Sequence, residues 1–178
     1  MYLNVDEGFV DGELALLTDL LELLDTKLAC IQDEIANQRD PESAGLTDRC
    51  EYFIGVGLCA VRQYLVDTLT FTGVSKAAAF NVGPITNGVN IVSALNAGAN
   101  WWKHSAEWWS AGKVPTSGDG AFSLVAGIVD GNTDYALANL LAKLLGSPRL
   151  KLVELIPHLV DWRAAVDRVR GKRILTES

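Results

Sequence analysis

A polar stripe on one predicted helix holds the residues of this chain that are best suited to chemistry. Asn96, Asn100, Lys103, His104 and Glu107 recur at helical spacings, so an α-helix places them on one side. Histidine can act as a general acid or base near neutral pH, and asparagine and lysine can donate hydrogen bonds to an anion. The stripe therefore predicts acid–base chemistry or anion binding, with His104 as the candidate catalytic residue.

Two tryptophans flank this stripe on the same helix. We expect the rings of Trp101 and Trp108 to be exposed beside His104. Exposed Trp beside His and Asn indicates a surface that is covered by another subunit or by a ligand with stacking rings. An ordinary solvated helix face is the alternative interpretation, and the sequence leaves both open. The residues that we assign to substrate or partner binding are Asn96, Asn100, Lys103, Glu107, Trp101 and Trp108.

The stretch from Leu95 to His104, LNAGANWWKH, resembles the motif helix of the HEPN superfamily of helical bundles. The resemblance covers mainly residues 11–110. Many members of that superfamily are metal-independent endoribonucleases of toxin and antiphage systems, in which two motif helices meet across a homodimer. The resemblance therefore implies a homodimer that acts on RNA in a bacterial defence or toxin–antitoxin system, without a cofactor.

The chain departs from the family motif at one position that matters for catalysis. The family places an Arg four to six residues before the His, whereas no arginine lies between Asn96 and His104. An amide cannot supply the charge that stabilises a phosphorane-like transition state. Lys103, or Arg62 on the preceding predicted helix, would have to supply it. The residues leave open whether the chain is a ribonuclease or a degenerate relative of one.

Two hypotheses from other classes fit the same residues. The formal net charge is −7, from 15 Lys and Arg against 22 Asp and Glu, which favours an acidic antitoxin or immunity protein that neutralises a basic partner. A structural oligomeric bundle is the other hypothesis, with Trp101 and Trp108 buried at an interface. Any nucleic-acid role requires a local basic patch, because the chain as a whole repels phosphates.

The sequence offers no metal, cofactor or membrane signal. Neither His104 nor His158 has zinc-ligand spacing, and we expect His158 at a core boundary. The stretch 130–134 begins like an EF-hand loop, but Tyr135 replaces the required glycine, so a helix-capping turn is expected. The acidic N-terminus is unlike a signal peptide, and no stretch is long and apolar enough to span a membrane. We therefore predict a cytoplasmic protein.

The three cysteines, Cys30, Cys50 and Cys59, fall within apolar helical patterns. Free cysteines in such patterns usually behave as small buried hydrophobes, so we expect all three to be buried and reduced. Gly55 and Gly57 interrupt an apolar helix without any nucleotide-loop spacing around them. We expect these two glycines to let a neighbouring helix approach closely.

Hydrophobic periodicity predicts helices along the whole chain and no convincing strand. N-caps are expected at Thr47 or Asp48 and at Thr133 or Asp134, and a kink or break is expected near Ile156 because of Pro157. The fold is predicted to be a single all-α domain, 1–178, forming a bundle of about five to seven helices with its core at about 11–170 and a polar tail at 171–178. The predicted helices are 14–35, 47–71, 75–80, 89–110, 121–129, 133–145 and 150–169.

Overall fold

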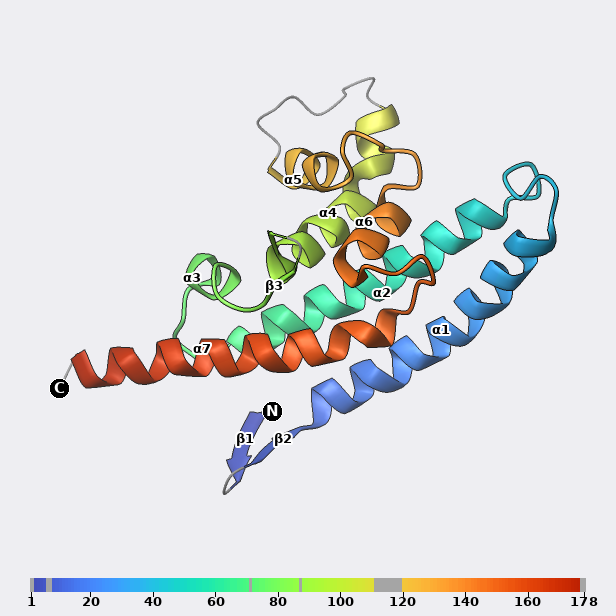
Figure 1. The fold of residues 1–178 in the computed structure, drawn as a ribbon. Coiled ribbons are helices and arrows are strands. Elements are labelled where there is room, and N and C mark those ends of the chain that lie inside the picture. The colour runs from blue at the N-terminus through green and yellow to red at the C-terminus, as the bar shows by residue number, and fades with distance from the viewer. Residues whose placement is uncertain (1, 6–7, 71, 87, 111–119, 177–178) are drawn as a thin grey trace.

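The computed structural model describes the backbone of residues 2–5, 8–70, 72–86, 88–110 and 120–176, and their side chains except those of 2–10, 109 and 171–176. Within these ranges the protein is an all-α bundle, as predicted (Figure 1). The elements, in chain order, are β1 (Tyr2–Val5), β2 (Gly8–Asp11), α1 (Gly12–Asn37), α2 (Leu46–Leu69), α3 (Lys76–Phe80), β3 (Ile85–Thr86), β4 (Val89–Asn90), α4 (Ile91–Ser110), α5 (Gly120–Ile128), α6 (Ala136–Leu145), the 3₁₀ helix η1 (Leu152–Leu155) and α7 (Ile156–Thr176).

Helix α2 is the central helix of the bundle. It packs against α1, α4 and α6 and also touches α3, and its residues Ile54, Leu58 and Leu65 are almost fully buried. A helix that is surrounded by other helices needs apolar residues on most of its sides, and the α2 sequence provides them. Figure 1 shows α1 and α2 side by side as an antiparallel pair.

Two glycines of α2 allow neighbouring side chains to reach its backbone. A Cβ atom on Gly55 would lie 2.2 Å from Cδ2 of Trp102 in α4, and one on Gly57 would lie 2.5 Å from Cδ1 of Leu152 in η1. These distances confirm the predicted close approach. The packing that it allows offsets the helix propensity of glycine, which costs about 1 kcal/mol per residue relative to alanine.

Carboxylates on α1 and α2 cap helices that come much later in the chain. Glu51 of α2 accepts hydrogen bonds from two backbone N–H groups in the first turn of α6, at 2.8 and 2.9 Å. Asp25 of α1 accepts two from the start of η1, at 2.7 and 2.9 Å. Unpaired N–H groups at a helix start favour an anionic acceptor, so these contacts fix where α6 and η1 sit on the bundle.

The side chains predicted as N-caps of α2 and α6 do not have that role. Both helices begin after a residue in the left-handed region, Gly45 with φ 68° and Tyr135 with φ 51°. Neither helix has an N-cap side-chain hydrogen bond, and at α6 Glu51 supplies the acceptor from another helix instead. The caps that were predicted wrongly are Thr47 or Asp48 for α2 and Thr133 or Asp134 for α6.

Two small hairpins were not predicted. Strand β1 pairs antiparallel with β2 over four residue pairs, and β3 pairs with β4 over two. Such short hairpins cannot bury a face of their own, so they leave the all-α class unchanged. The predicted break near Ile156 is confirmed: η1 ends there and Pro157 lies in the first turn of α7, where proline is tolerated. Helix α7 then continues to Thr176, beyond the predicted end at residue 169.

The three cysteines are free, but only one of them is fully buried. Burial raises the pKa of the Cys50 thiol to about 11, while Cys59 is half-buried. Cys30 is exposed on α1, so the prediction that all three are buried is wrong for this residue. His158 is half-buried at the core boundary, as expected. None of the helices that the structure describes has the length and apolar character needed to span a membrane.

A buried ion pair joins the start of α1 to α7. The Arg163 side chain is 6% exposed, and its guanidinium donates to the equally buried carboxylate of Asp11. Asp11 also accepts from the Tyr64 hydroxyl of α2 at 2.8 Å and from the N–H of Leu14 at 3.0 Å. Burial raises the pKa of Tyr64 to about 12. One carboxylate therefore connects α1, α2 and α7.

Removing one member of this pair should be costly. Arg163→Met leaves the Asp11 carboxylate buried without its cation, and we expect the free energy of unfolding to fall by about 3–5 kcal/mol. The double variant Asp11→Asn/Arg163→Met should recover much of that loss, because no unpaired charge remains and Asn can still cap α1. Urea unfolding of the wild type, the two single variants and the double variant measures the coupling between Asp11 and Arg163. Strictly additive losses would show that the pair does not act as a unit.

The close approach at Gly55 gives a second prediction. Gly55→Ala places a methyl group inside the Trp102 ring and should lower the free energy of unfolding by about 1–3 kcal/mol, despite the better helix propensity of alanine. Gly127→Ala in α5 is the matched control, because nothing lies within 4 Å of its Cβ position. That control should be neutral or stabilising by up to about 1 kcal/mol. Equal effects of the two variants in urea unfolding would contradict the proposed packing role.

Candidate functional site

Helix α2 packs antiparallel against α4, the helix that carries the polar stripe. Gly55 lies against Trp102, and one turn further along α2 the Cys59 thiol donates to the carbonyl oxygen of Ala99 at 3.8 Å. Residue numbers thus rise along α2 as they fall along α4. The next turn of α2 carries Arg62, which this register places level with the first residue of the stripe.

Arg62 and Asn96 each have a buried polar atom without a partner. Nε of Arg62 and Oδ1 of Asn96 form no hydrogen bond within the part of the chain that the structure describes. Buried polar groups are nearly always paired, and an unpaired one costs about 1–3 kcal/mol. One atom is a donor and the other an acceptor, and both lie at the same level of the α2–α4 interface. The two unpaired atoms therefore lower the stability of this part of the α2–α4 interface.

Helix α3 is held against the start of α4 and carries a further cation. The Ser75 hydroxyl caps α3 by accepting from the N–H of Ala78 at 3.3 Å. The Phe80 carbonyl oxygen accepts from the Ser93 hydroxyl of α4 at 2.9 Å, which ties the end of α3 to the first turn of α4. Lys76 lies at the start of α3, with its ammonium 5.1 Å from the centroid of the Phe80 ring.

Arg62 and Lys103 both act electrostatically on Lys76, and we call these three residues the basic cluster. Burial, and then the charges of Arg62 and Lys103, lower the pKa of Lys76. The same two charges partly oppose the rise that burial causes in the pKa of Cys59. Among the described residues, no carboxylate forms an ion pair with a member of the cluster. Three helices thus bring together three cations without an acidic partner.

The polar stripe lies only partly on the surface. Lys103 and Glu107 are exposed, whereas Asn96 and Asn100 are half-buried. The His104 side chain is 43% exposed, and its Nδ1 lies 3.1 Å from Oε2 of Glu107. The structure therefore gives His104 an orienting carboxylate one turn along α4.

The prediction that Trp101 is exposed is wrong. Trp101 is 5% exposed because Phe122 of α5 stacks on it, with ring centroids 5.1 Å apart and planes 13° apart. Trp108 is half-buried and meets both rings edge-on, at centroid distances of 5.6 and 6.0 Å. It stays beside His104, 6.3 Å between ring centroids. Trp101 thus leaves the candidate site, and Trp108 remains at its edge.

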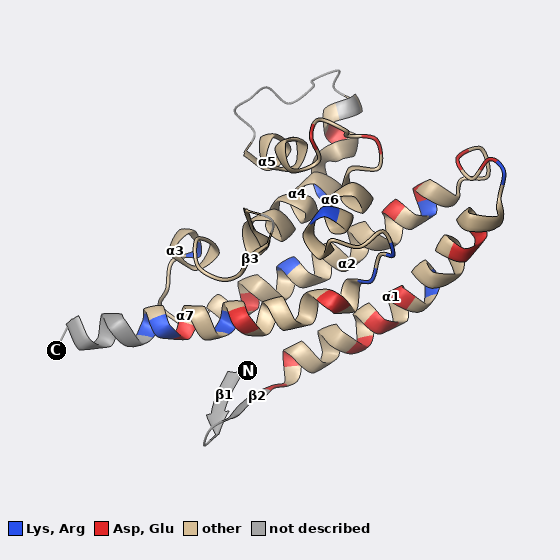
Figure 2. Ribbon diagram, viewed as in Figure 1, with Lys and Arg blue, Asp and Glu red and all other residues tan. Residues whose placement is uncertain are grey.

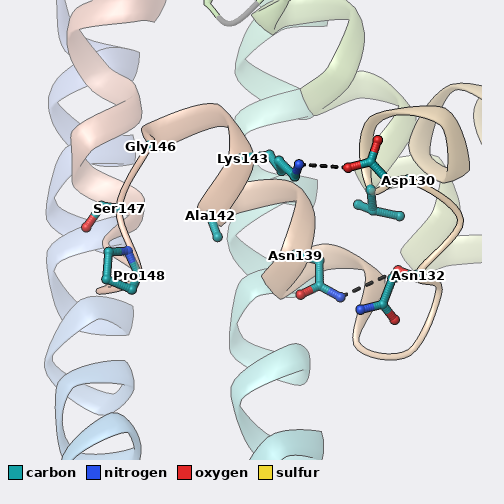
Figure 3. A pocket seen from close by; sticks show the side chains of 9 residues that line it. Asp130, Asn132, Asn139, Ala142, Lys143, Gly146, Ser147 and Pro148 are labelled. Atoms are coloured by element: carbon teal, nitrogen blue, oxygen red, sulfur yellow. Dashed lines mark hydrogen bonds and ion pairs between the residues drawn. The ribbon is translucent and has the colours of Figure 1, made fainter.

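A shallow pocket of about 570 Å³ lies away from this site, between the turns that precede and follow α6. Figure 3 shows Lys143 pointing toward Asp130, with Nζ and Oδ2 2.8 Å apart, and Asn139 near Asn132. The Asn139 amide also donates to the carbonyl of Asp134 at 2.8 Å. The polar groups of the pocket pair with one another and no predicted site residue lines the pocket, so we assign the pocket no function. No group of three or more His, Cys, Asp or Glu among the described residues is placed to hold a metal ion.

Comparison of the chain with family models, curated proteins and solved structures gave no match. The site is therefore defined by its own residues. Sequence reasoning identified Arg62 and Lys103 as cations near the stripe but missed Lys76. The only signal for Lys76 was its place at the start of a Ser-capped turn, and nothing in that turn indicates which helix it packs against.

Mutual repulsion within the basic cluster should cost stability. Lys103→Gln is expected to raise the free energy of unfolding by about 0.5 kcal/mol at low salt, because it relieves repulsion between like charges. The gain should shrink in about 0.5 M NaCl, where such charges are screened. Lys151→Gln is the control, since that lysine is exposed just before η1 and is not one of the charges that lower the pKa of Lys76. A loss of stability in Lys103→Gln would show that the lysine has a stabilising partner instead.

Proposed function

We propose that the protein binds RNA through phosphates at the basic cluster beside the α4 stripe, as a HEPN-like domain. The observation that carries the proposal is the gathering of Arg62, Lys76 and Lys103 from three helices, without an acidic partner among the described residues. In a chain with a formal charge of −7, such a cluster is a local concentration of positive charge. It is the local basic patch that a nucleic-acid role requires.

The unpaired atoms beside the cluster support a nucleotide ligand. No internal hydrogen bond fixes Nε of Arg62 within the described chain, so the guanidinium can turn toward a phosphate without breaking a bond at that edge. Oδ1 of Asn96 is a buried acceptor, which a ribose hydroxyl or a base amine would satisfy once the half-buried side chain turns outward. A phosphate and a hydroxyl donor occur together in RNA, which favours RNA over a simple anion.

His104 is the candidate acid or base of this site. It follows Lys103 directly, and Glu107 orients its ring. The family's catalytic Arg has no equivalent on α4, so catalysis depends on charge supplied by Arg62 or Lys103. The resemblance to HEPN proteins extends the proposal to a homodimer in a bacterial defence or toxin–antitoxin system. The free cysteines are consistent with a cytoplasmic location.

Binding is tested with a fluorescein-labelled single-stranded RNA, by anisotropy at several salt concentrations. Lys76→Gln and Lys103→Gln should each weaken binding, and each should flatten the slope of log K against log salt by about 0.7 for every phosphate that is no longer neutralised. Lys151→Gln should leave the affinity unchanged. The proposal fails if the wild type does not bind at low salt, or if Lys151→Gln weakens binding as much as the cluster variants do.

Catalysis is tested separately, with a mixed pool of single-stranded and structured RNA in the presence and absence of EDTA. Cleavage that survives EDTA and disappears in His104→Ala would identify a metal-independent ribonuclease. Binding without cleavage would identify an RNA-binding relative without catalytic activity. Cleavage of equal rate in His104→Ala would point to a contaminating nuclease.

A further inference from the structure

Three leucines form an exposed row along α1, which we call the leucine stripe. Leu16, Leu20 and Leu23 are 71%, 37% and 61% exposed, and their spacing of four and three residues places them on one side of the helix. Single exposed apolar side chains are common, but a contiguous row usually marks an interaction surface. The stripe borders a groove of about 270 Å³ between α1 and α2, which Leu16, Leu20 and Tyr64 help to line.

Acidic side chains surround the leucine stripe. Glu13 and Asp67 line the groove on one side, and Asp19 and Glu22 follow the stripe on the other. The carboxylates of Asp19 and Glu22 form no ion pair with any described residue. Lys27 is the only basic residue of α1. Figure 2 shows acidic residues distributed along the helix.

We propose that the leucine stripe is the docking site for a cationic amphipathic helix of a partner protein. Apolar residues at i, i+4 and i+7 would pack on the three leucines and into the groove, as in other complexes where a helix lies on an apolar surface. Lys and Arg beside them would face Asp19, Glu22 and Asp67. Charge complementarity thus defines the occupant.

The same charges oppose two other occupants. A second copy bound through the same surface would bring Asp19 and Glu22 against their own equivalents or near them, because a two-fold interface is self-complementary. An anionic lipid surface would be repelled as well. The stripe lies on α1 and the basic cluster on α2, α3 and α4, so this inference stands independently of RNA binding.

The probe is a labelled synthetic helix of about 18 residues, with leucines along one face and lysines elsewhere. Leu16→Ser/Leu23→Ser should weaken its binding about tenfold or more, because two large apolar side chains no longer pack on the probe. Asp19→Asn/Glu22→Gln should also weaken it and reduce its salt dependence. Ile85→Ser/Val160→Ser is the matched control, since these side chains are exposed by 70% and 44% on other elements, and it should bind as the wild type does.

Several outcomes would overturn the proposal. These are absence of saturable binding, equal binding of a scrambled peptide of the same composition, and equal weakening by the control variant. Sedimentation provides one more: a wild-type dimer that Leu16→Ser/Leu23→Ser dissociates would show that a second copy covers the stripe. Peptide binding that is unchanged in Lys76→Gln, and RNA binding that is unchanged in the leucine variant, would separate the two sites.

Discussion

The indole of Trp102 lies on the backbone of α2 at Gly55, where even a methyl group would overlap the ring. This contact sets both the distance between α2 and α4 and the register in which they pass. The register places Cys59 against Ala99 and brings Arg62 to the polar stripe two turns away from the glycine. The position of Arg62 beside the polar stripe therefore depends on a glycine that takes no part in the chemistry of the proposed RNA site.

Buried polar groups of this protein have two different environments. Asp25 and Glu51 each accept two backbone hydrogen bonds from a distant helix start, and Asp11 has a buried cation as its partner. Their bonding capacity is used within the fold. Within the described chain, Arg62 and Asn96 keep a buried atom without a partner, beside like charges. Folding alone would not favour that arrangement, and the proposed RNA site would account for it.

The sequence was sufficient to predict the elements that are determined within a single segment of the chain. The apolar periodicity of α1, the apolar surface of α2 and the proline at the start of α7 each act within one segment, and these elements were predicted correctly. Glycine approach at Gly55 was also predictable, because a costly residue inside a helix implies a compensating neighbour. The identity of the neighbour was not predictable, since Trp102 is 47 residues away from Gly55 in the chain.

The candidate site was less predictable, because its environment is formed by separate segments. Helical spacing placed His104 and Glu107 together correctly, as they lie on a single helix. The same helical spacing predicted an exposed Trp101, yet Phe122 of α5 covers its ring. Nothing in the sequence of α4 indicates that α5 folds over that side. Lys76 lies on α3, which the hydrogen bond from Ser93 to the Phe80 carbonyl ties to α4. Tertiary contacts of this kind override a pattern that belongs to one helix.

Net charge describes this molecule poorly because its charges are segregated. A total of −7 suggests a protein that repels phosphate everywhere. At physiological ionic strength, however, exposed charges act over a Debye length of about 8 Å, so a patch responds mainly to its own neighbours. The acidic residues of α1 lie along its surface, and one of them, Asp25, accepts a hydrogen bond from the start of η1. The basic cluster lies elsewhere, where α2, α3 and α4 meet. Two surfaces of opposite sign can thus coexist on one small bundle, and each would favour a ligand that the other would disfavour.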